Sequence, residues 1–168
     1  SEAGRIIADL TARLIAASGL MENGMSFQTG AGATSLATAR ALAPLMADRN
    51  ITGGFACGGI TGALVDMHRA GLFRELMDVQ AFDAAGVASY RDDPAHHGIS
   101  ASTYASPDRD CIAHRLDVVV LGAAEIDLDF NVNVTTGSDG RLIGGSGGHA
   151  DTWLLDPYDD ADDLTRGT

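Results

Sequence analysis

One pattern constrains the fold more than any other feature: strand-like segments end at glycine turns, and helix-like segments follow. Residues 25–29 and 51–57 are strand-like and lead into glycine turns, and helical periodicity follows over 33–47 and 61–70. This order is typical of an α/β protein with a mostly parallel sheet flanked by helices. Such sheets bind ligands at the carboxyl ends of their strands, where these glycine turns lie.

Three further segments predict one more helix and two more strands. Residues 3–17 predict an amphipathic helix, and 116–122 are continuously apolar, as in a strand covered on both faces. Residues 130–135 predict another strand, which carries Asn131 and Asn133 on one side. The apolar stripe of the first helix is made of Ile6, Ile7, Leu10, Leu14 and Ile15.

The charge balance excludes two classes of partner. Eleven Arg and no Lys face 23 acidic residues, for a formal net charge of −12. Nucleic acids and anionic membranes are bound through positive charge, so we expect neither as a partner. An anion can still bind through a local Arg or through backbone N–H groups.

The sequence pattern predicts one α/β lobe over residues 1–155 and an acidic tail over 156–168. From 151 onward, six Asp and one Arg give a net charge of −5, and periodicity ends, so the tail is expected to be disordered. No apolar run reaches the roughly 18 residues of a membrane span, and the first residues lack a basic-then-apolar pattern, so we expect no export signal. Cys57 and Cys111 are isolated, which favours reduced thiols in the cytoplasm over a zinc site or a disulfide.

Two glycine-rich loops are candidate anion sites. The GGSGG loop at 144–148 offers backbone N–H groups for a phosphate or an oxyanion, although a mobile turn explains it equally well. The QTGAG loop at 28–32 precedes a helix N-terminus, which favours anion binding. Neither loop matches the nucleotide P-loop or the Rossmann fingerprint.

Acidic and histidine residues supply candidates for chemistry. Glu125 and Asp127 lie two positions apart and share one face of an extended segment, where they can act as a pair or Glu125 can act as a nucleophile. Solvated or turn-capping acids are the alternative. His149 adjoins the GGSGG loop and is the histidine to test, whereas His68 is expected on the surface and His96 in an exposed loop. No histidine spacing suggests a metal, so we expect none.

Six strings in a fixed order carry a family resemblance over residues 3–152. They are SFQTGAGATSLATARAL (26–42), FACGGITGALVDMHRAGLF (55–73), DVQAFD (78–83), ISASTYASP (99–107), LDVVVLGAAEIDLDFNVNVTTGSDG (116–140) and GGSGGHAD (144–151). The chain resembles the alpha subunit of bacterial citrate lyase, the citrate CoA-transferase component of that complex.

The resemblance implies a fold like that of CoA-transferases and ribose-5-phosphate isomerase. It also implies exchange of acetate for citrate on a thioester, whose thiol belongs to a CoA-like prosthetic group on an acyl carrier protein. A beta subunit then cleaves the citryl thioester into oxaloacetate and the acetyl thioester. No cofactor is expected to be bound permanently to this chain. The expected partners are the beta subunit, the acyl carrier protein and a first lobe of the alpha subunit, together with self-association.

The residues and the resemblance together give three groups of candidate site residues. The catalytic candidates are Glu125 and Asp127. The candidates for oxyanion and thioester binding are Gly144, Gly145, Ser146, Gly147, Gly148 and His149, in a loop similar to the GxGGAxD loop of related CoA-transferases. The candidates for binding substrate or the CoA moiety are Gln28, Thr29, Gly30, Gly58, Gly59, Asn131 and Asn133.

Two departures from the family pattern leave alternatives open. The family subunit is much longer and has two similar halves, and this chain looks like the start of its second half. Many CoA-transferases also carry a nucleophilic Glu just after the strand that here ends in Cys57-Gly58-Gly59, and no Glu stands there, so direct attack by the substrate carboxylate can replace a covalent enzyme intermediate. The alternatives are another acyl-CoA transferase or hydrolase, and a non-catalytic lobe that only assembles with a partner.

Overall fold

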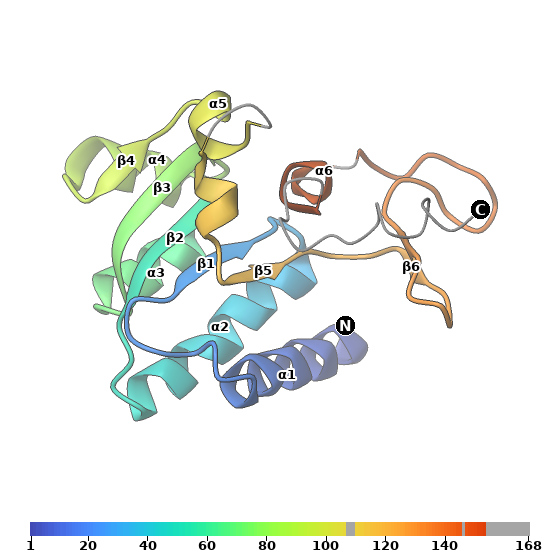
Figure 1. Cartoon of the computed structure of the whole chain (residues 1–168), viewed down its shortest axis with the longest axis horizontal. Helices are drawn as coiled ribbons and strands as arrows, with labels where there is room; N and C mark the ends of the chain where they lie inside the picture. The colour runs from blue at the N-terminus through green and yellow to red at the C-terminus, as the bar shows by residue number, and fades with distance from the viewer. Residues whose placement is uncertain (107–109, 146, 154–168) are drawn as a thin grey trace. The chain divides into compact units, whose positions relative to one another are not determined.

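The structure is a computed structural model that describes residues 1–106, 110–145 and 147–153 (Figure 1). The chain divides into two compact units, which are described separately below. The sheet unit comprises Ser1–Ser100 and Leu116–Gly122, and the hairpin unit comprises Ala101–Arg115 and Ala123–Thr168. The expected acidic tail at 156–168 and the candidate residue Ser146 lie outside the described residues.

The sheet unit is built around a five-stranded parallel sheet in the order β4-β3-β2-β1-β5. Its elements in chain order are α1 (Glu2–Ala17), β1 (Ser26–Thr29), α2 (Ala33–Asp48), β2 (Gly53–Ile60), α3 (Gly62–Arg69), β3 (Phe73–Ala81), α4 (Ala84–Asp92), β4 (His96–Gly98) and β5 (Val118–Val120). The predicted α/β class with a mostly parallel sheet is therefore confirmed.

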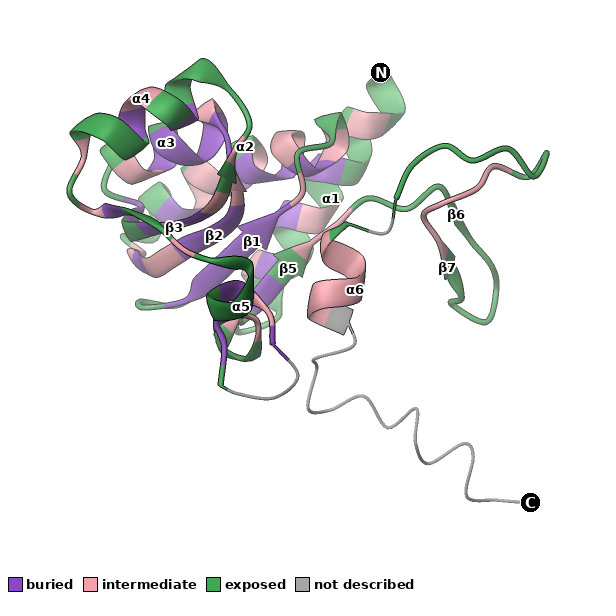
Figure 2. Ribbon diagram, turned by 90° about the horizontal axis from the view of Figure 1, so that it is seen from above, coloured by how far each residue is buried: buried purple, intermediate pink, exposed green. Residues whose placement is uncertain are grey.

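Helices α2, α3 and α4 lie along one side of the strands (Figure 2). The chain steps from β1 to β2, β3 and β4 in one direction, and right-handed crossovers then place each connecting helix on the same face. Apolar side chains fill the space between these layers, with Phe27, Leu42, Leu64 and Phe73 almost fully buried. The rings of Phe27 on β1 and Phe73 on β3 stack at a centroid distance of 6.0 Å.

The central strand β2 owes its close packing to glycine. A Cβ atom on Gly53 would lie 2.4 Å from the buried ring of Phe73, and one on Gly54 would lie 2.6 Å from the carbonyl oxygen of Gly24. Real Cβ atoms do not approach other atoms so closely. Glycine at these positions therefore lets neighbouring segments reach the backbone of β2 directly.

The apolar stripe of α1 does not face the core, except at Ile15. Ile6, Ile7, Leu10 and Leu14 are 52–69% exposed, while the buried side of the helix is made of Ala8, Ala12 and Ile15. Small alanine side chains allow α1 and α2 to pack closely, which turns the large aliphatic side chains outward. This leaves an apolar outer face on α1.

Strand β5 differs from the expectation of a long strand covered on both faces. Only Val118–Val120 are extended, they pair with β1 alone, and Val119 is 37% exposed, so β5 is an edge strand. The preceding residue, Asp117, is held by Ser26 of β1: its Oδ2 accepts hydrogen bonds from the Ser26 N–H (2.7 Å) and Oγ (2.8 Å). The Asp117 N–H donates to Ser26 Oγ in return (2.8 Å), which aligns the two strands at their first residues.

Two histidines lie where the sequence did not place them. His96 was expected in an exposed loop, but it begins edge strand β4 and is 4% exposed. His68 was expected on the surface, but its ring is largely buried and bonds to the carbonyl oxygen of Phe73 (2.8 Å) and to Asp93 (3.0 Å). The sequence did not indicate α4 or β4, which bury His96, because α4 has little apolar periodicity.

Asp83 joins the N-termini of two helices. Its Oδ1 accepts a hydrogen bond from the Gly86 N–H in the first turn of α4 (2.8 Å), and its Oδ2 accepts one from the Gly62 N–H at the start of α3 (2.7 Å). Thr61, the residue just before α3, makes no capping hydrogen bond through its side chain. The two N–H groups lower the pKa of Asp83. One carboxylate thus caps both helices.

We predict that Asp83→Ala lowers the free energy of unfolding by about 1–2 kcal/mol at neutral pH, because a helix cap is lost. Since the pKa of Asp83 is lowered in the folded chain, its stabilisation is present above the ordinary value of 3.8 and is lost as the pH falls through the lowered pKa. Urea unfolding of both proteins, at neutral pH and in acid, measures the difference. The control is Asp92→Ala, which removes an exposed ion pair with Arg91 and should change little. Equal stability of Asp83→Ala and the parent chain at neutral pH would contradict the double cap.

The hairpin unit has short elements. They are α5 (Ala101–Tyr104), the 3-10 helix η1 (Ile112–Arg115), the strands β6 (Glu125–Ile126) and β7 (Val132–Asn133), and α6 (Gly148–Trp153). The expected strand at 130–135 is reduced to two residues, since Phe130 has a positive φ of 63° and belongs to the turn between β6 and β7. None of the helices in the described ranges is both long and apolar enough to cross a membrane.

Candidate functional site

The candidates Gln28, Thr29 and Gly30 lie at the carboxyl end of β1, as the sequence indicated. Gln28 and Thr29 are 3% and 1% exposed, so the strand end is packed and not open. The Gly30 N–H donates to the Val120 carbonyl oxygen (2.9 Å), which extends the pairing of β1 with β5. The backbone of Gly30 is therefore engaged in the sheet, and binding of a substrate by these three residues stays a prediction.

Gly58 and Gly59 lie inside β2 and not in a turn after it, which corrects the expected strand boundary. Strand β2 continues to Ile60, and its register with β3 shifts between the two glycines. Gly58 has a φ of +102°, and a Cβ there would lie 3.3 Å from the side chain of Gln28. A Cβ on Gly59 would lie 1.7 Å from Cε2 of the Phe82 ring, closer than any real contact. Both glycines admit a neighbouring side chain against the strand.

We predict that Gly58→Ala lowers the free energy of unfolding by about 1–3 kcal/mol, because alanine is strained at this φ. Thermal and urea unfolding measure the loss. Gly122→Ala is the matched control, since its Cβ would meet no atom within 4 Å and its φ is ordinary. A Gly58→Ala chain as stable as Gly122→Ala would show that the backbone at the bulge can relax.

The strand ends also gather a polar network that the sequence did not reveal. Asp78 of β3, which pairs in register with Gly58, accepts a hydrogen bond at Oδ2 from Nε2 of buried His96 (3.1 Å). Nδ1 of His96 lies 3.0 Å from Oγ of Ser89 on α4. Burial raises the pKa of Asp78, and the hydrogen bond from His96 opposes that shift. The signal available in the sequence was the position of Asp78 within the DVQAFD string.

Both cysteines are buried, and Cys57 does not offer a nucleophile. Cys57 and Cys111 are free and buried, and burial raises the pKa of the Cys57 thiol to about 12. A thiol with so high a pKa is not ionised at neutral pH. Among the described residues, no three His, Cys, Asp or Glu side chains are placed to hold a metal ion.

In the hairpin unit, the structure brings together four candidates that the sequence treated as two separate motifs. Strands β6 and β7 are antiparallel, with Glu125 opposite Asn133. Oε2 of Glu125 accepts a hydrogen bond from Nδ2 of Asn133 (2.9 Å), and Oδ2 of Asp127 accepts one from Nδ2 of Asn131 (2.8 Å). Each acid is therefore paired with an amide across the hairpin.

The two carboxylates differ in how far they are engaged. Oδ1 of Asp127 also accepts hydrogen bonds from the backbone N–H groups of Asp129 and Asn131 (both 2.9 Å), so Asp127 holds the turn. The side chain of Asn131, followed by these N–H groups, lowers the pKa of Asp127. Glu125 is exposed, and its carboxylate accepts its hydrogen bond from the side chain of Asn133. Of the two catalytic candidates, Glu125 has the carboxylate that is more available to a substrate.

The glycine-rich loop precedes α6. The Gly144 N–H makes a long hydrogen bond of 3.4 Å to the Thr135 carbonyl oxygen, whereas a Cβ on Gly145 or Gly147 would meet no atom of the described residues within 4 Å. Gly147 has a φ of +50°, and Gly148 and His149 begin α6. The space around Gly145 and Gly147 leaves room for a ligand to approach the backbone, although oxyanion binding there stays a prediction.

Comparison with known proteins identifies the family to which the chain belongs. The model of the family described as "Citrate lyase, alpha subunit (CitF)" matches residues 3–155. The chain belongs to the citrate lyase alpha subunit family. The resemblance drawn from the sequence strings is thereby confirmed.

Curated relatives in the citrate lyase alpha family are similar to this chain in sequence. The chain is 51% identical to the citrate lyase alpha chain of Escherichia coli (strain K12) and 48% identical to that of Klebsiella pneumoniae, each over 148 residues. These matches cover 88% of this chain but 29% of each relative, so the chain spans less than a third of their length.

A solved structure supports the same assignment. A crystal structure from Streptococcus mutans, described as the alpha subunit of citrate lyase in complex with citrate, superposes with a TM-score of 0.84 and 44% identity. The match covers 89% of this chain and 30% of that one.

Proposed function

We propose that this chain is part of a citrate CoA-transferase, which exchanges acetate for citrate on the thioester of an acyl carrier protein. Membership of the citrate lyase alpha family is the observation that carries this proposal. The citrate in the Streptococcus mutans complex is consistent with citrate as the acid that enters the exchange. The isolated, buried cysteines are consistent with a cytoplasmic location.

Glu125 is the group to which we assign a role at the thioester. If it is the nucleophile, its carboxylate oxygen bonds to the acyl carbon, the carbon–sulfur bond breaks and the thiolate leaves. The amide of Asn133 then orients that carboxylate, and Asp127 with Asn131 holds the turn beside it. If the substrate carboxylate attacks directly, Glu125 instead has a supporting role.

The glycine loop fits the approach of a CoA-like thioester arm. Gly145 and Gly147 leave open space at the backbone, and Gly147 has a φ that a β-branched residue would not tolerate. When it is present on the carrier, the prosthetic group supplies the thiol of the thioester. Backbone N–H groups of this chain would then stabilise the developing oxyanion.

The transferase is tested by adding labelled citrate and acetylated acyl carrier protein to the purified chain. Label on the carrier supports the proposal, and exchange with other acids but not citrate favours a different acyl-CoA transferase. Release of acetate without exchange indicates a hydrolase. If no exchange occurs alone, the chain is added to an alpha subunit that lacks the matching region. If the chain then binds that subunit but does not restore activity, the chain is a non-catalytic assembly lobe. The exposed apolar face of α1 favours this second function.

We predict that Glu125→Gln reduces citrate exchange by about 100-fold or more if Glu125 attacks the thioester, since the amide is a poor nucleophile. The exchange assay measures the loss, and trapping with hydroxylamine during turnover labels residue 125. Glu75→Gln is the control, because Glu75 is an exposed glutamate on β3 in the sheet unit. Full activity in Glu125→Gln, without trapping, would assign the attack to the substrate carboxylate.

The expected partners are a beta subunit, the acyl carrier protein and the remaining lobe of the alpha subunit. The outer face of α1 provides a surface for assembly, because Ile6, Ile7, Leu10 and Leu14 expose large apolar side chains side by side on one helix. Contiguous apolar surface of this kind is seldom left uncovered in a folded protein. In the absence of the other partners, we expect two copies of the chain to cover it.

We predict that the purified chain self-associates and that Leu10→Glu with Leu14→Glu raises the dissociation constant by about tenfold or more, because two apolar side chains per copy lose their burial. Light scattering over a range of concentrations measures the change. Val87→Glu, which alters an exposed apolar residue of α4, should leave the dissociation constant unchanged. A chain that stays monomeric at high concentration would contradict self-association.

A further inference from the structure

His68 is held at both of its ring nitrogens by oxygen atoms from two other elements. Its side chain lies in the last turn of α3 and is 10% exposed. Nδ1 lies 2.8 Å from the carbonyl oxygen of Phe73, the first residue of β3, and Nε2 lies 3.0 Å from Oδ2 of Asp93, the residue after α4. The ring therefore joins three successive elements of the sheet unit.

Both of these oxygens can only accept a hydrogen bond. A carbonyl oxygen carries no hydrogen, and the Asp93 carboxylate is ionised, because the N–H of Ala95 and the ring of His68 lower its pKa. Each contact therefore requires a hydrogen on the ring nitrogen. A neutral imidazole carries one such hydrogen, and an imidazolium carries two. The two contacts together can be made only by the charged form of His68.

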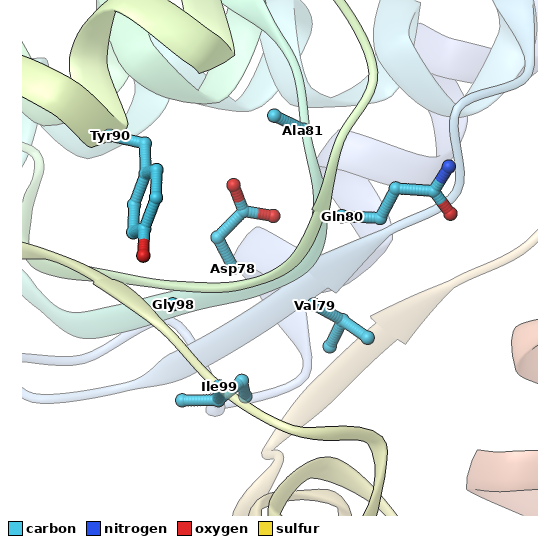
Figure 3. Close-up of a pocket in the computed structure, with 7 residues that line it drawn as sticks. All are labelled: Asp78, Val79, Gln80, Ala81, Tyr90, Gly98 and Ile99. Atoms are coloured by element: carbon cyan, nitrogen blue, oxygen red, sulfur yellow. The ribbon is translucent and has the colours of Figure 1, made fainter.

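His96 shows a different arrangement in the same part of the sheet. Its Nε2 faces the carboxylate of Asp78, which lies beside Tyr90 in Figure 3, but its Nδ1 faces the hydroxyl group of Ser89 at 3.0 Å. A hydroxyl group can donate to Nδ1 while the Nε2–H group donates to Asp78. A neutral ring therefore satisfies both partners of His96, and of the two histidines only His68 needs a positive charge.

Asp93 is the counter-ion of His68. In the described part of the chain, no other ionisable side chain bonds to the ring. His96 acts on Asp93 electrostatically but bonds to Asp78. One cation thus faces one anion at the turn after α4. The remaining charged side chains of the three elements are exposed, and they are Asp66 and Arg69 of α3, Arg74 and Glu75 of β3, and Arg91 and Asp92 of α4.

The turn that carries Asp93 sets the start of edge strand β4. Oδ1 of Asp93 accepts a hydrogen bond from the Ala95 N–H (2.9 Å), and its carbonyl oxygen accepts one from the His96 N–H (3.1 Å). The Ala95 carbonyl oxygen accepts a further bond from the Leu76 N–H of β3 (3.0 Å). Since β4 has three residues and pairs with β3 alone, its attachment depends on this turn.

We propose that His68 is an imidazolium in the folded chain at neutral pH, and that it acts as a pH-sensitive latch that holds the turn between α4 and β4 on α3 and β3. When the proton leaves Nε2, a lone pair faces the carboxylate of Asp93, so attraction becomes repulsion, while Nδ1–H keeps its bond to Phe73. The folded chain thus holds a proton that an unfolded histidine releases around neutral pH.

The sign of the pH dependence follows from this difference in bound protons. Because the folded chain binds the extra proton, the stabilisation is present in mild acid and is lost as the pH rises. In strong acid it is lost as well, as the pH falls through the lowered pKa of Asp93. The latch therefore opens on the alkaline side of neutrality. Neither His68 nor Asp93 belongs to the candidates for thioester exchange, so the latch is separate from that chemistry.

The charge on His68 is tested by nitrogen NMR of the isotope-labelled full chain at about pH 7.5, where an ordinary histidine, with a pKa of about 6.5, is largely neutral. An imidazolium gives nearly equal chemical shifts for its two ring nitrogens, whereas a neutral ring gives widely separated ones. We expect the charged pattern at His68, and exposed His97 of the same chain is the reference for a solvated ring. A neutral pattern at His68 would overturn the proposal.

Asp93→Asn is the matched variant. The asparagine oxygen can still accept from the Ala95 N–H, and its amide can donate to Nε2 of a neutral ring, so we expect the neutral pattern at His68. Asp92→Asn removes the same charge one residue away, from an exposed pair with Arg91, and should leave His68 charged. A charged His68 in Asp93→Asn, or a neutral one in Asp92→Asn, would contradict the assignment of Asp93 as counter-ion.

The latch is tested by amide hydrogen exchange, expressed as protection factors so that the intrinsic effect of pH is removed. We expect protection of the Ala95 and His96 amides to fall by about threefold or more between about pH 6.5 and about pH 8.5 in the parent chain, and to stay constant in Asp93→Asn. No fall in the parent, or an equal fall in both chains, would show that His68 is no latch. If Asp93→Asn does not fold, the spectrum and the exchange of the parent chain decide alone.

Discussion

The close approach of neighbouring segments to β2 is the constraint on which the sheet unit depends. Four of its eight residues are glycine: Cβ atoms on three of them would collide with Phe73, with the carbonyl oxygen of Gly24 or with Phe82, and one on Gly58 would make a tight contact with Gln28. At its glycines the central strand contributes only backbone, so neighbouring side chains fill that space, while its own Ala56, Cys57 and Ile60 are buried in the core. Phe27 and Phe73 illustrate this, because their rings stack across a strand that separates them in the sheet.

The sequence predicted the fold class well because glycine turns and periodicity are local signals. It failed for features that depend on which other element a helix face or a strand packs against. The apolar stripe of α1 was visible, but periodicity does not say that the alanine side of the helix packs on α2. In the same way, 116–122 looked like a buried strand, and its edge position followed from pairing with β1 that no local pattern encodes.

In the candidate site, too, the sequence revealed local motifs but not the contacts between them. Glu125 and Asp127 were recognised as a motif, and Asn131 and Asn133 as another, but only the hairpin shows that each acid pairs with an amide. Asp78 and His96 lie 18 positions apart, and their contact arises because β3 and β4 are adjacent in the sheet. Pairing between residues on different strands is a tertiary property, so spacing along the chain did not reveal it.

The clamp between Ser26 and Asp117 has a consequence for synthesis of the protein on the ribosome. The two residues are separated by 91 positions, so β1 emerges long before the strand that covers its outer edge. During that interval the apolar strand around Phe27 can pair with β2 but has an open row of N–H and C=O groups on its other side. The edge of β1 in the nascent chain is therefore open to pairing with another chain until Asp117 has left the exit tunnel.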